Sequence, residues 1–453
     1  MKPSNFNFFV HYESDQVYLG YNCVSGGLFV FSEKQYDEIK KIFSEPDKEK
    51  TSVVKEKLIK GRFLIDDDLN ELQLLKVRNN SSRFNPNGLG IVATPTLNCI
   101  CDCPYCYVDR DKISMSTETI EKVKKFFNKK IEIVEEAASC WTGGEPLLAM
   151  DIVEELNNHF LEKSRKKNKK FFSSMITNGY LLNPDILERV IKCGIEVLQI
   201  TIDGYREYHD RFRTTMSGQK TYSKILENVI YASNKNLKII LRSNVEKENY
   251  ESIYKLIDDL ADSDLNKDNI LYAPCMVMDV ETSKGHYCGN CFSNKEFSEL
   301  EPQILNYSMS KGFKLSKHLL STTSTFCGAN TMSLVVIDAY ANVLKCWCNL
   351  GRAETNMVGY IDDDGVIKHT NYKNTIKWMS WDPFDIEECK NCPVLPICMG
   401  GCMYYNVMGE TDVIDVGCSQ RKHNLCEMIK LYYKYCKENG HAKLQDVGLL
   451  TNN

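Results

Sequence analysis

The sequence predicts an α/β fold in which a partial, six-unit (β/α)6 barrel lies between two smaller parts. Six apolar strands alternate with helices after residue 89, which is typical of parallel βα units. The stretch is shorter than the roughly 250 residues of a full eight-unit barrel. A small α+β module precedes it, and a cysteine-dense region follows; 20 of the 453 residues are Cys.

The N-terminal module is expected over residues 1–85. Alternating apolar residues predict strands at 5–12, 17–21 and 28–31. Ser32 is an expected N-cap of a first helix, and Gly61 follows a second helix at 52–60. Residues 64–65 and 72–77 are expected as wing-like strands, in a winged-helix-like arrangement. Residues 78–88 contain Asn, Ser, Pro and Gly and are expected as a linker.

The barrel pattern follows this linker. Its strands are expected at residues 90–93, 139–142, 171–177, 197–202, 239–245 and 270–277. Its helices are expected at residues 117–136, 151–163, 184–193, 222–233 and 250–260.

Composition and charge exclude several classes of protein. With 43% hydrophobic and 26% charged residues the chain is typical of globular proteins, and the net charge of −5 does not favour a nucleic-acid partner. No apolar run reaches the about 18 residues of a membrane span, and the N-terminus lacks a signal-peptide pattern. We therefore expect a cytoplasmic protein. Thiols stay reduced there, so closely spaced cysteines favour metal or iron–sulfur ligation over disulfides.

The first cysteine cluster lies on the loop after the first barrel strand. Cys99, Cys103 and Cys106 form C-x3-C-x2-C. Three thiolates can hold three irons of a 4Fe–4S cluster and leave the fourth open. The alternative is a zinc site with a fourth ligand elsewhere. Polar or glycine residues also end the next strands, on the rim where barrel enzymes place their chemistry: Gly143, Gly144, Glu145, Asn178, Thr201 and Arg242.

Together these motifs resemble the radical S-adenosylmethionine (SAM) superfamily, including Tyr105 before the last cysteine and the Gly-Gly-Glu-Pro run. Cys101 is an extra thiol outside that pattern. The resemblance implies that SAM binds the open iron and is cleaved to a 5′-deoxyadenosyl radical, which takes a hydrogen atom from the substrate. It implies that Gly143, Gly144 and Glu145 approach the cofactor amino group. It also implies that Asn178, Thr201 and Arg242 contact its ribose or carboxylate.

The C-terminal cysteines resemble the SPASM extension of such enzymes, which binds two auxiliary 4Fe–4S clusters. The resemblance implies a SAM core at 86–312, a SPASM domain at 313–440 and a tail at 441–453. One cluster would be held by Cys389, Cys392, Cys398 and Cys418, and the other by Cys327, Cys346 and Cys402. The fourth position of the second cluster is open, or is filled by Cys348, Cys288 or Cys291.

We therefore expect an oxidoreductase of the peptide-maturase kind, with three 4Fe–4S clusters and SAM as cofactors. The N-terminal module resembles the peptide-recognition domain of such maturases; the alternative is a structural cap on the barrel. The expected reaction is a thioether or carbon–carbon cross-link in a ribosomal precursor peptide. Alternatives are an anaerobic sulfatase-maturing enzyme, against which the residues before Cys99 argue, and a non-catalytic zinc or electron-carrier protein. Expected partners are the peptide and a reducing donor such as flavodoxin or ferredoxin.

Overall fold

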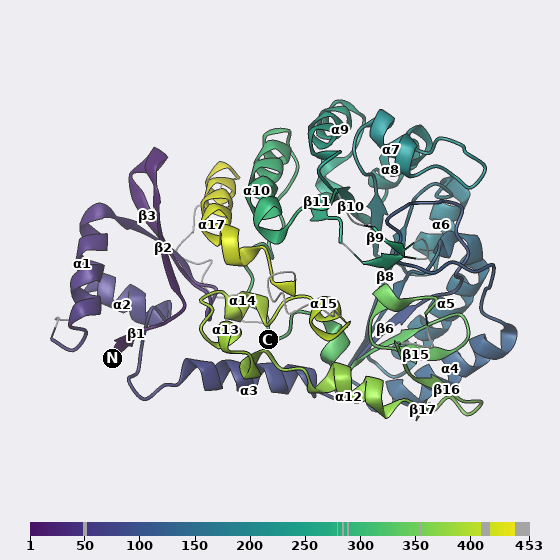
Figure 1. Ribbon diagram of the computed structural model, residues 1–453, viewed down its shortest axis with the longest axis horizontal. Coiled ribbons are helices and arrows are strands. Elements are labelled where there is room, and N and C mark those ends of the chain that lie inside the picture. Colours follow the sequence, from purple (N-terminus) through teal and green to yellow (C-terminus); the bar gives the residue numbers. More distant parts are fainter. Residues whose placement is uncertain are drawn as a thin grey trace.

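The computed structural model describes residues 1–48, 52–278, 280–282, 285–287, 290–352, 356–408 and 417–439. Cys288 and the predicted tail lie outside these residues. Figure 1 shows the N-terminal module at one end and the barrel at the other, with C-terminal helices between them. Helix α3 (Glu71–Arg83) runs along the bottom of this view and links the two ends.

The N-terminal module contains the three predicted strands in one antiparallel sheet. Their order is β2 (Asn7–Tyr12), β3 (Val17–Asn22) and β4 (Leu28–Ser32). A capping box between Ser32 and Gln35 begins α1 (Glu33–Ser44), and Ser52 caps α2 (Val53–Lys60). Both helices and the sheet share an aromatic-rich core that includes Phe31 and Phe63.

The predicted wing is wrong. Residues 72–77 belong to helix α3, which Asn70 caps, and β5 (Leu64–Ile65) pairs instead with β1 (Lys2–Pro3). The helix buries Glu71, Leu75, Asn79 and Arg83, one residue per turn. Because three of these four are polar, the buried stripe is hidden in the hydropathy pattern, and the local Leu-Gln-Leu order imitates a strand. The helix also occupies much of the predicted linker.

The central sheet has ten strands, in the order β11-β10-β9-β8-β7-β6-β14-β15-β16-β17. The first six are parallel, as predicted. They are β6 (Gly88–Ala93), β7 (Glu136–Trp141), β8 (Lys170–Thr177), β9 (Val197–Thr201), β10 (Lys238–Val245) and β11 (Ile270–Met276). The intervening helices are α4 (Thr117–Ile131), α5 (Met150–Lys166), α6 (Pro184–Lys192), α7 (Arg206–Phe212), α8 (Tyr222–Ser233) and α9 (Tyr250–Asp262).

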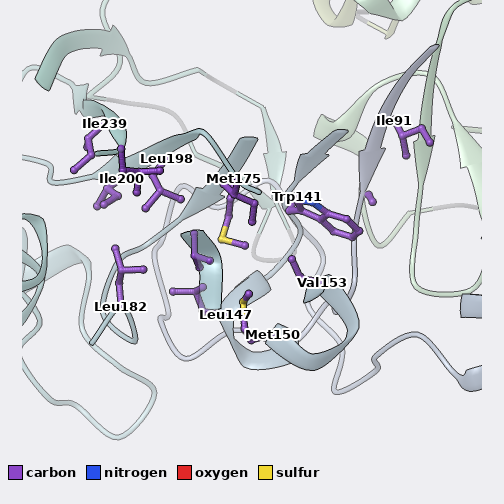
Figure 2. Packing of buried hydrophobic residues seen from close by; sticks show 14 of the residues in the cluster. Ile91, Trp141, Leu147, Met150, Val153, Met175, Leu182, Leu198, Ile200 and Ile239 are labelled. Carbon is purple, nitrogen blue, oxygen red and sulfur yellow. The ribbon is translucent and has the colours of Figure 1, made fainter. Parts of the chain in front are cut away.

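These helices bury one continuous core against the sheet. Figure 2 shows Trp141, Met175 and Leu198 side by side across neighbouring strands, with Met150 and Val153 of α5 facing them. All five side chains are almost completely buried. The parallel strands therefore end at one common rim, which carries the predicted site.

The C-terminal region continues the barrel sheet. Strand β14 (Leu334–Ile337) lies parallel to β6, and β15 (Asn342–Leu344), β16 (Met357–Ile361) and β17 (Ile367–His369) follow in antiparallel order. The sheet thus crosses the expected boundary at 312/313. The remaining elements are β12 (Glu281–Thr282), β13 (Gly285–His286), α10 (Asn294–Ser310), α12 (Tyr372–Ser380), α13 (Glu387–Lys390), α14 (Leu395–Cys398), α15 (Met403–Met408) and α17 (Arg421–Glu438).

The N-terminal module is built into the C-terminal region. Its residues Leu19, Tyr21 and Cys23 share a hydrophobic cluster with α10, α17 and the segment around Cys398. The Tyr21 hydroxyl donates to the carbonyl of Leu320, and Tyr433 of α17 donates to Asp15 at 2.8 Å. Among the described residues, none of the helices is both long and apolar enough to cross a membrane.

Candidate functional site

A cavity of about 370 Å³ opens at the carboxyl ends of the barrel strands. The structure brings nearly all of the predicted core-site residues to its wall. They are Cys99, Cys103, Cys106, Gly143, Gly144, Asn178, Thr201 and Arg242. The cavity is also lined by three residues that the sequence analysis did not place there: Cys101, Arg213 and Cys348. The volume is within the usual range of small-molecule sites.

The extra thiol of Cys101 lies between two predicted cluster ligands. Cys101 is buried, and its backbone N–H donates to the sulfur of Cys99 at 3.5 Å. The neighbouring Cys101 thiol and the positive charge of Arg213 lower the pKa of Cys103 to about 7, although burial opposes them. Burial instead raises the pKa of Cys106 to about 11. The surroundings of Cys103 thus favour its thiolate, and thiolates are the form that binds metal.

A buried polar network anchors the cysteine loop to the barrel. Tyr105 donates to the carboxylate of Asp203, and Arg213 donates to the Tyr105 oxygen at 2.7 Å and to Asp203 at 3.2 Å. The second Asp203 oxygen accepts the backbone N–H of Asn244 at 2.8 Å. The network joins the ends of β9 and β10 to the loop. The sequence analysis assigned no role to Asp203 or Arg213.

Gly143 and Gly144 lie tightly against the chain that leads into Cys99. A Cβ on Gly143, whose φ is +129°, would lie 2.6 Å from the carbonyl oxygen of Thr96, and one on Gly144 would lie 2.1 Å from that of Asn98. Backbone hydrogen bonds from Gly144 to Thr96 and from Glu145 to Asn98 close this contact. Only glycine fits at either position, because any side chain would push the cysteine loop away.

Glu145 is fully buried beside the cavity but does not line it. One carboxylate oxygen accepts the N–H of Leu147 at 3.0 Å and the hydroxyl of Thr177 at 2.7 Å, and the other accepts the N–H of Asn178 at 2.8 Å. Glu145 thus joins the ends of β7 and β8. Its predicted contact with the cofactor amino group stays a prediction.

The cavity offers polar groups for a bound molecule. Among the described residues, the buried side-chain nitrogen of Asn178 has no hydrogen-bond partner, although its oxygen accepts the N–H of Tyr180 at 2.9 Å. Buried amides normally find partners, so this one is available to a ligand. With three thiols of one loop and Arg242 lining the same cavity, the donor set fits an iron–sulfur cluster and a polar, carboxylate-bearing cofactor.

The structure gathers the C-terminal cysteines into two groups. The first group lines a small cavity of about 50 Å³ and consists of Cys389, Cys392, Cys398 and Cys418. The second group consists of Cys327, Cys346 and Cys402. Burial and the two neighbouring thiols raise the pKa of Cys402 to about 11. Cys348 neighbours Cys346, whose pKa it helps to raise, and it also lines the main cavity.

Cys291 is the remaining candidate ligand among the described residues. The sulfur of Cys291 lies 3.6 Å from the carbonyl oxygen of Tyr287. Over the described part of the chain, no three His, Cys, Asp or Glu side chains converge closely enough to hold a single metal ion.

Comparison with known proteins agrees with this geometry. Residues 94–260 match the family model of the radical SAM superfamily. The chain is 24% identical, over 335 residues, to a cysteine-type anaerobic sulfatase-maturating enzyme of Clostridium novyi (strain NT), covering 69% of this chain and 87% of that protein. It is 22% identical, over 351 residues, to the radical SAM cyclopropyl synthase TigE of Paramaledivibacter caminithermalis, covering 68% of each.

A solved structure shares the fold. The structure of anSMEcpe with bound AdoMet and the Cp18Cys peptide superposes with a TM-score of 0.57 at 19% identity, covering 80% of this chain and 99% of that one. The cysteine loop and the barrel rim described above lie within the part that the family model matches. The chain therefore contains a radical SAM domain, over residues 94–260.

Proposed function

We propose that this chain is a radical SAM enzyme that oxidatively modifies a peptide or protein substrate. The observation that carries the proposal is the shared cavity, which Cys99, Cys103 and Cys106 line together with Asn178 and Arg242. When bound, the cluster and SAM supply a carbon radical that abstracts hydrogen, and the protein supplies binding, orientation and enclosure.

Each part of the cavity has a role in this proposal. The three cysteines hold the cluster, and Gly143 and Gly144 let the rim approach it closely. The free amide nitrogen of Asn178 donates to an oxygen of the cofactor. Arg242, which lines the same cavity, pairs with the cofactor carboxylate. The buried network of Tyr105, Asp203 and Arg213 keeps the cysteine loop in place.

Two auxiliary clusters belong to the proposal, so that a loaded chain carries three. The grouping of Cys389, Cys392, Cys398 and Cys418 around one small cavity supports the first. The neighbourhood of Cys327, Cys346 and Cys402 supports the second. Anaerobic reconstitution is expected to give about 12 irons per chain, from three four-iron clusters. A value near four, with zinc in the C-terminal groups, contradicts this.

The reaction that we propose is a thioether or carbon–carbon cross-link in a precursor peptide. The N-terminal module supports it, because a sheet with an antiparallel edge can add a peptide strand. The second candidate is oxidation of Cys or Ser to formylglycine. It is supported by the similarity to a sulfatase-maturating enzyme that covers 87% of that protein. The similarities support both candidates equally.

Mass spectrometry separates the two reactions. Reconstituted protein with SAM and dithionite is offered a cysteine-rich precursor peptide and, separately, a sulfatase-derived cysteine peptide. A cross-link removes two hydrogen atoms and retains sulfur. Formylglycine replaces the cysteine sulfur by oxygen and also loses two hydrogens. Production of 5′-deoxyadenosine without either change rejects both substrates, and no 5′-deoxyadenosine at all rejects the radical proposal.

We also propose that a leader segment of the substrate binds residues 1–85. Within the described residues, β2 and β4 each pair only with β3, so each has an edge that can accept another strand. Amide hydrogen exchange of the full chain tests this with a leader peptide. Slower exchange confined to β2 or β4 is expected. Unchanged exchange throughout residues 1–48, at saturating peptide, contradicts leader binding at this sheet.

A further inference from the structure

A second, larger cavity lies on the barrel away from the candidate active site. It is a groove of about 680 Å³ between the C-terminal end of α4, the start of β14 and the hairpin of β16 and β17. Helix α4 and the strands β16 and β17 lie together at the lower right of Figure 1. Its wall is mostly apolar and includes Ile133, Met332 and Phe84, whose exposed fractions are 66%, 59% and 46%. Exposed apolar surface of this kind marks interaction sites.

The rim of the groove carries two lysines, Lys129 and Lys130, at the C-terminal end of α4, and His369 also lines it. Lys345 lines it too, but it is buried and its ammonium group is hydrogen-bonded to backbone carbonyls. None of its described lining residues is Asp or Glu, whereas the whole chain has a net charge of −5. An apolar floor inside a cationic rim is complementary to a partner that presents an apolar centre inside an acidic rim.

The groove also lies next to one group of candidate cluster ligands. Lys345 directly precedes Cys346, and its ammonium group donates to the carbonyls of Thr331 and Leu334 at 2.6 and 2.9 Å. Met332 follows Cys327 after one short turn, Gly328–Asn330. The same two chain segments therefore line the groove and carry Cys327 and Cys346.

From these observations we infer that the groove is the docking site of the electron donor, an acidic one-electron carrier protein. The inference rests on the proposed function, since SAM cleavage consumes one electron per turnover. In the docked complex the carrier loses one electron and the enzyme's iron–sulfur centres gain one; no bond forms or breaks. Because the electron enters at the groove, the main cavity stays available to the substrate, and the peptide and the carrier can bind at the same time.

Binding of flavodoxin to the full, reconstituted chain tests the inference. The double variant K129E/K130E reverses two rim charges, and K295E/K317E is the control with the same change in net charge. Lys295 lies on α10, far from α4 in Figure 1, and neither control lysine lines the groove. Wild type is expected to bind weakly, as transient redox partners do, and less tightly as salt rises. K129E/K130E is expected to bind about tenfold or more weakly, and the control is expected to bind as wild type.

A second variant tests the apolar floor without charge. I133S/M332S replaces two exposed side chains, so the fold is expected to persist, while flavodoxin affinity falls. Both groove variants are expected to keep wild-type 5′-deoxyadenosine formation with dithionite but to lose it with reduced flavodoxin.

Three results overturn the inference. The first is that wild type and both groove variants bind flavodoxin with equal affinity. The second is that K129E/K130E and the control lose flavodoxin affinity equally, because such a loss reports only the change in net charge. The third is a wild-type dimer, by sedimentation, that I133S/M332S makes monomeric, because a second copy then covers the groove. If wild type with dithionite makes no 5′-deoxyadenosine, the proposed function fails, while the binding comparison still decides the groove.

Discussion

Replacing Glu145 by Gln separates two roles for this residue, a brace of the barrel rim and a cofactor contact. In the structure its carboxylate accepts three hydrogen bonds, from Leu147, Thr177 and Asn178. Glutamine can keep the oxygen that serves Leu147 and Thr177. Its NH₂ group then faces the N–H of Asn178, so this N–H loses its acceptor and the buried NH₂ finds none there.

An unsatisfied buried donor costs about 1–3 kcal/mol, which is about a fivefold to 150-fold change in a local opening equilibrium. Because global unfolding of so large a chain is not two-state, the measurement is amide exchange of residues 145–148 and 177–180 in the protein without cofactors. We expect exchange there to accelerate by that factor in E145Q. The control E188Q, at a half-exposed ion pair, is expected to leave the exchange of both segments unchanged.

The affinity for SAM, measured separately on cluster-loaded protein, completes the comparison. If Glu145 is a brace, amide exchange is faster in E145Q even without cofactor, whether or not the affinity for SAM also falls. Unchanged exchange in the cofactor-free variant, together with weaker SAM binding, would refute the brace and support direct contact.

Three further predictions concern the cysteines. The triple variant of Cys99, Cys103 and Cys106 to Ala is expected to retain the auxiliary iron but make no 5′-deoxyadenosine; product formation in the reduced variant would contradict the cluster assignment. In the cofactor-free protein, C101A is expected to slow alkylation of Cys103 near pH 7, because losing the neighbouring thiol raises the pKa of Cys103 from about 7. Mass spectrometry of labelled peptides measures the alkylation rate. An unchanged rate argues against an interaction between the two thiols. With only the Cys327-group cluster loaded, a cysteine peptide is expected to change the electron paramagnetic resonance spectrum if the fourth iron is open. Loss of that cluster in C348S, with a spectrum insensitive to peptide, would instead make Cys348 the ligand.

The leader-binding experiment uses the whole chain because of how the N-terminal module packs. Leu19, Tyr21 and Cys23 are buried against α10, α17 and the C-terminal cysteine region. Deleting residues 1–85 would expose that apolar face, so a lost activity could not be assigned to leader binding. The packing also means that loss of a nearby auxiliary cluster is expected to loosen the module.

Much of the candidate site follows from the sequence, because its signals are local. Ligand spacing such as that of Cys99, Cys103 and Cys106 is a property of one loop. Apolar residues that repeat every two residues predict strands, and those that repeat about every 3.6 residues predict helices. The order of strand and helix then puts the polar strand ends on one rim, since parallel strands end together. For this reason the six parallel strands and their common rim were predicted correctly.

What the sequence left open depends on contacts between distant segments. The pairing of Tyr105 with Asp203 and Arg213 joins residues about one hundred positions apart, and no local pattern encodes it. Cys348 lines the main cavity only because β14 pairs with β6 and brings its segment there. Helix α3 was misjudged because its buried stripe is polar and gains its partners, such as the carbonyl of Ser324, only in the folded chain. Short-range chemistry thus determined which residues can act, and long-range packing determined which of them meet.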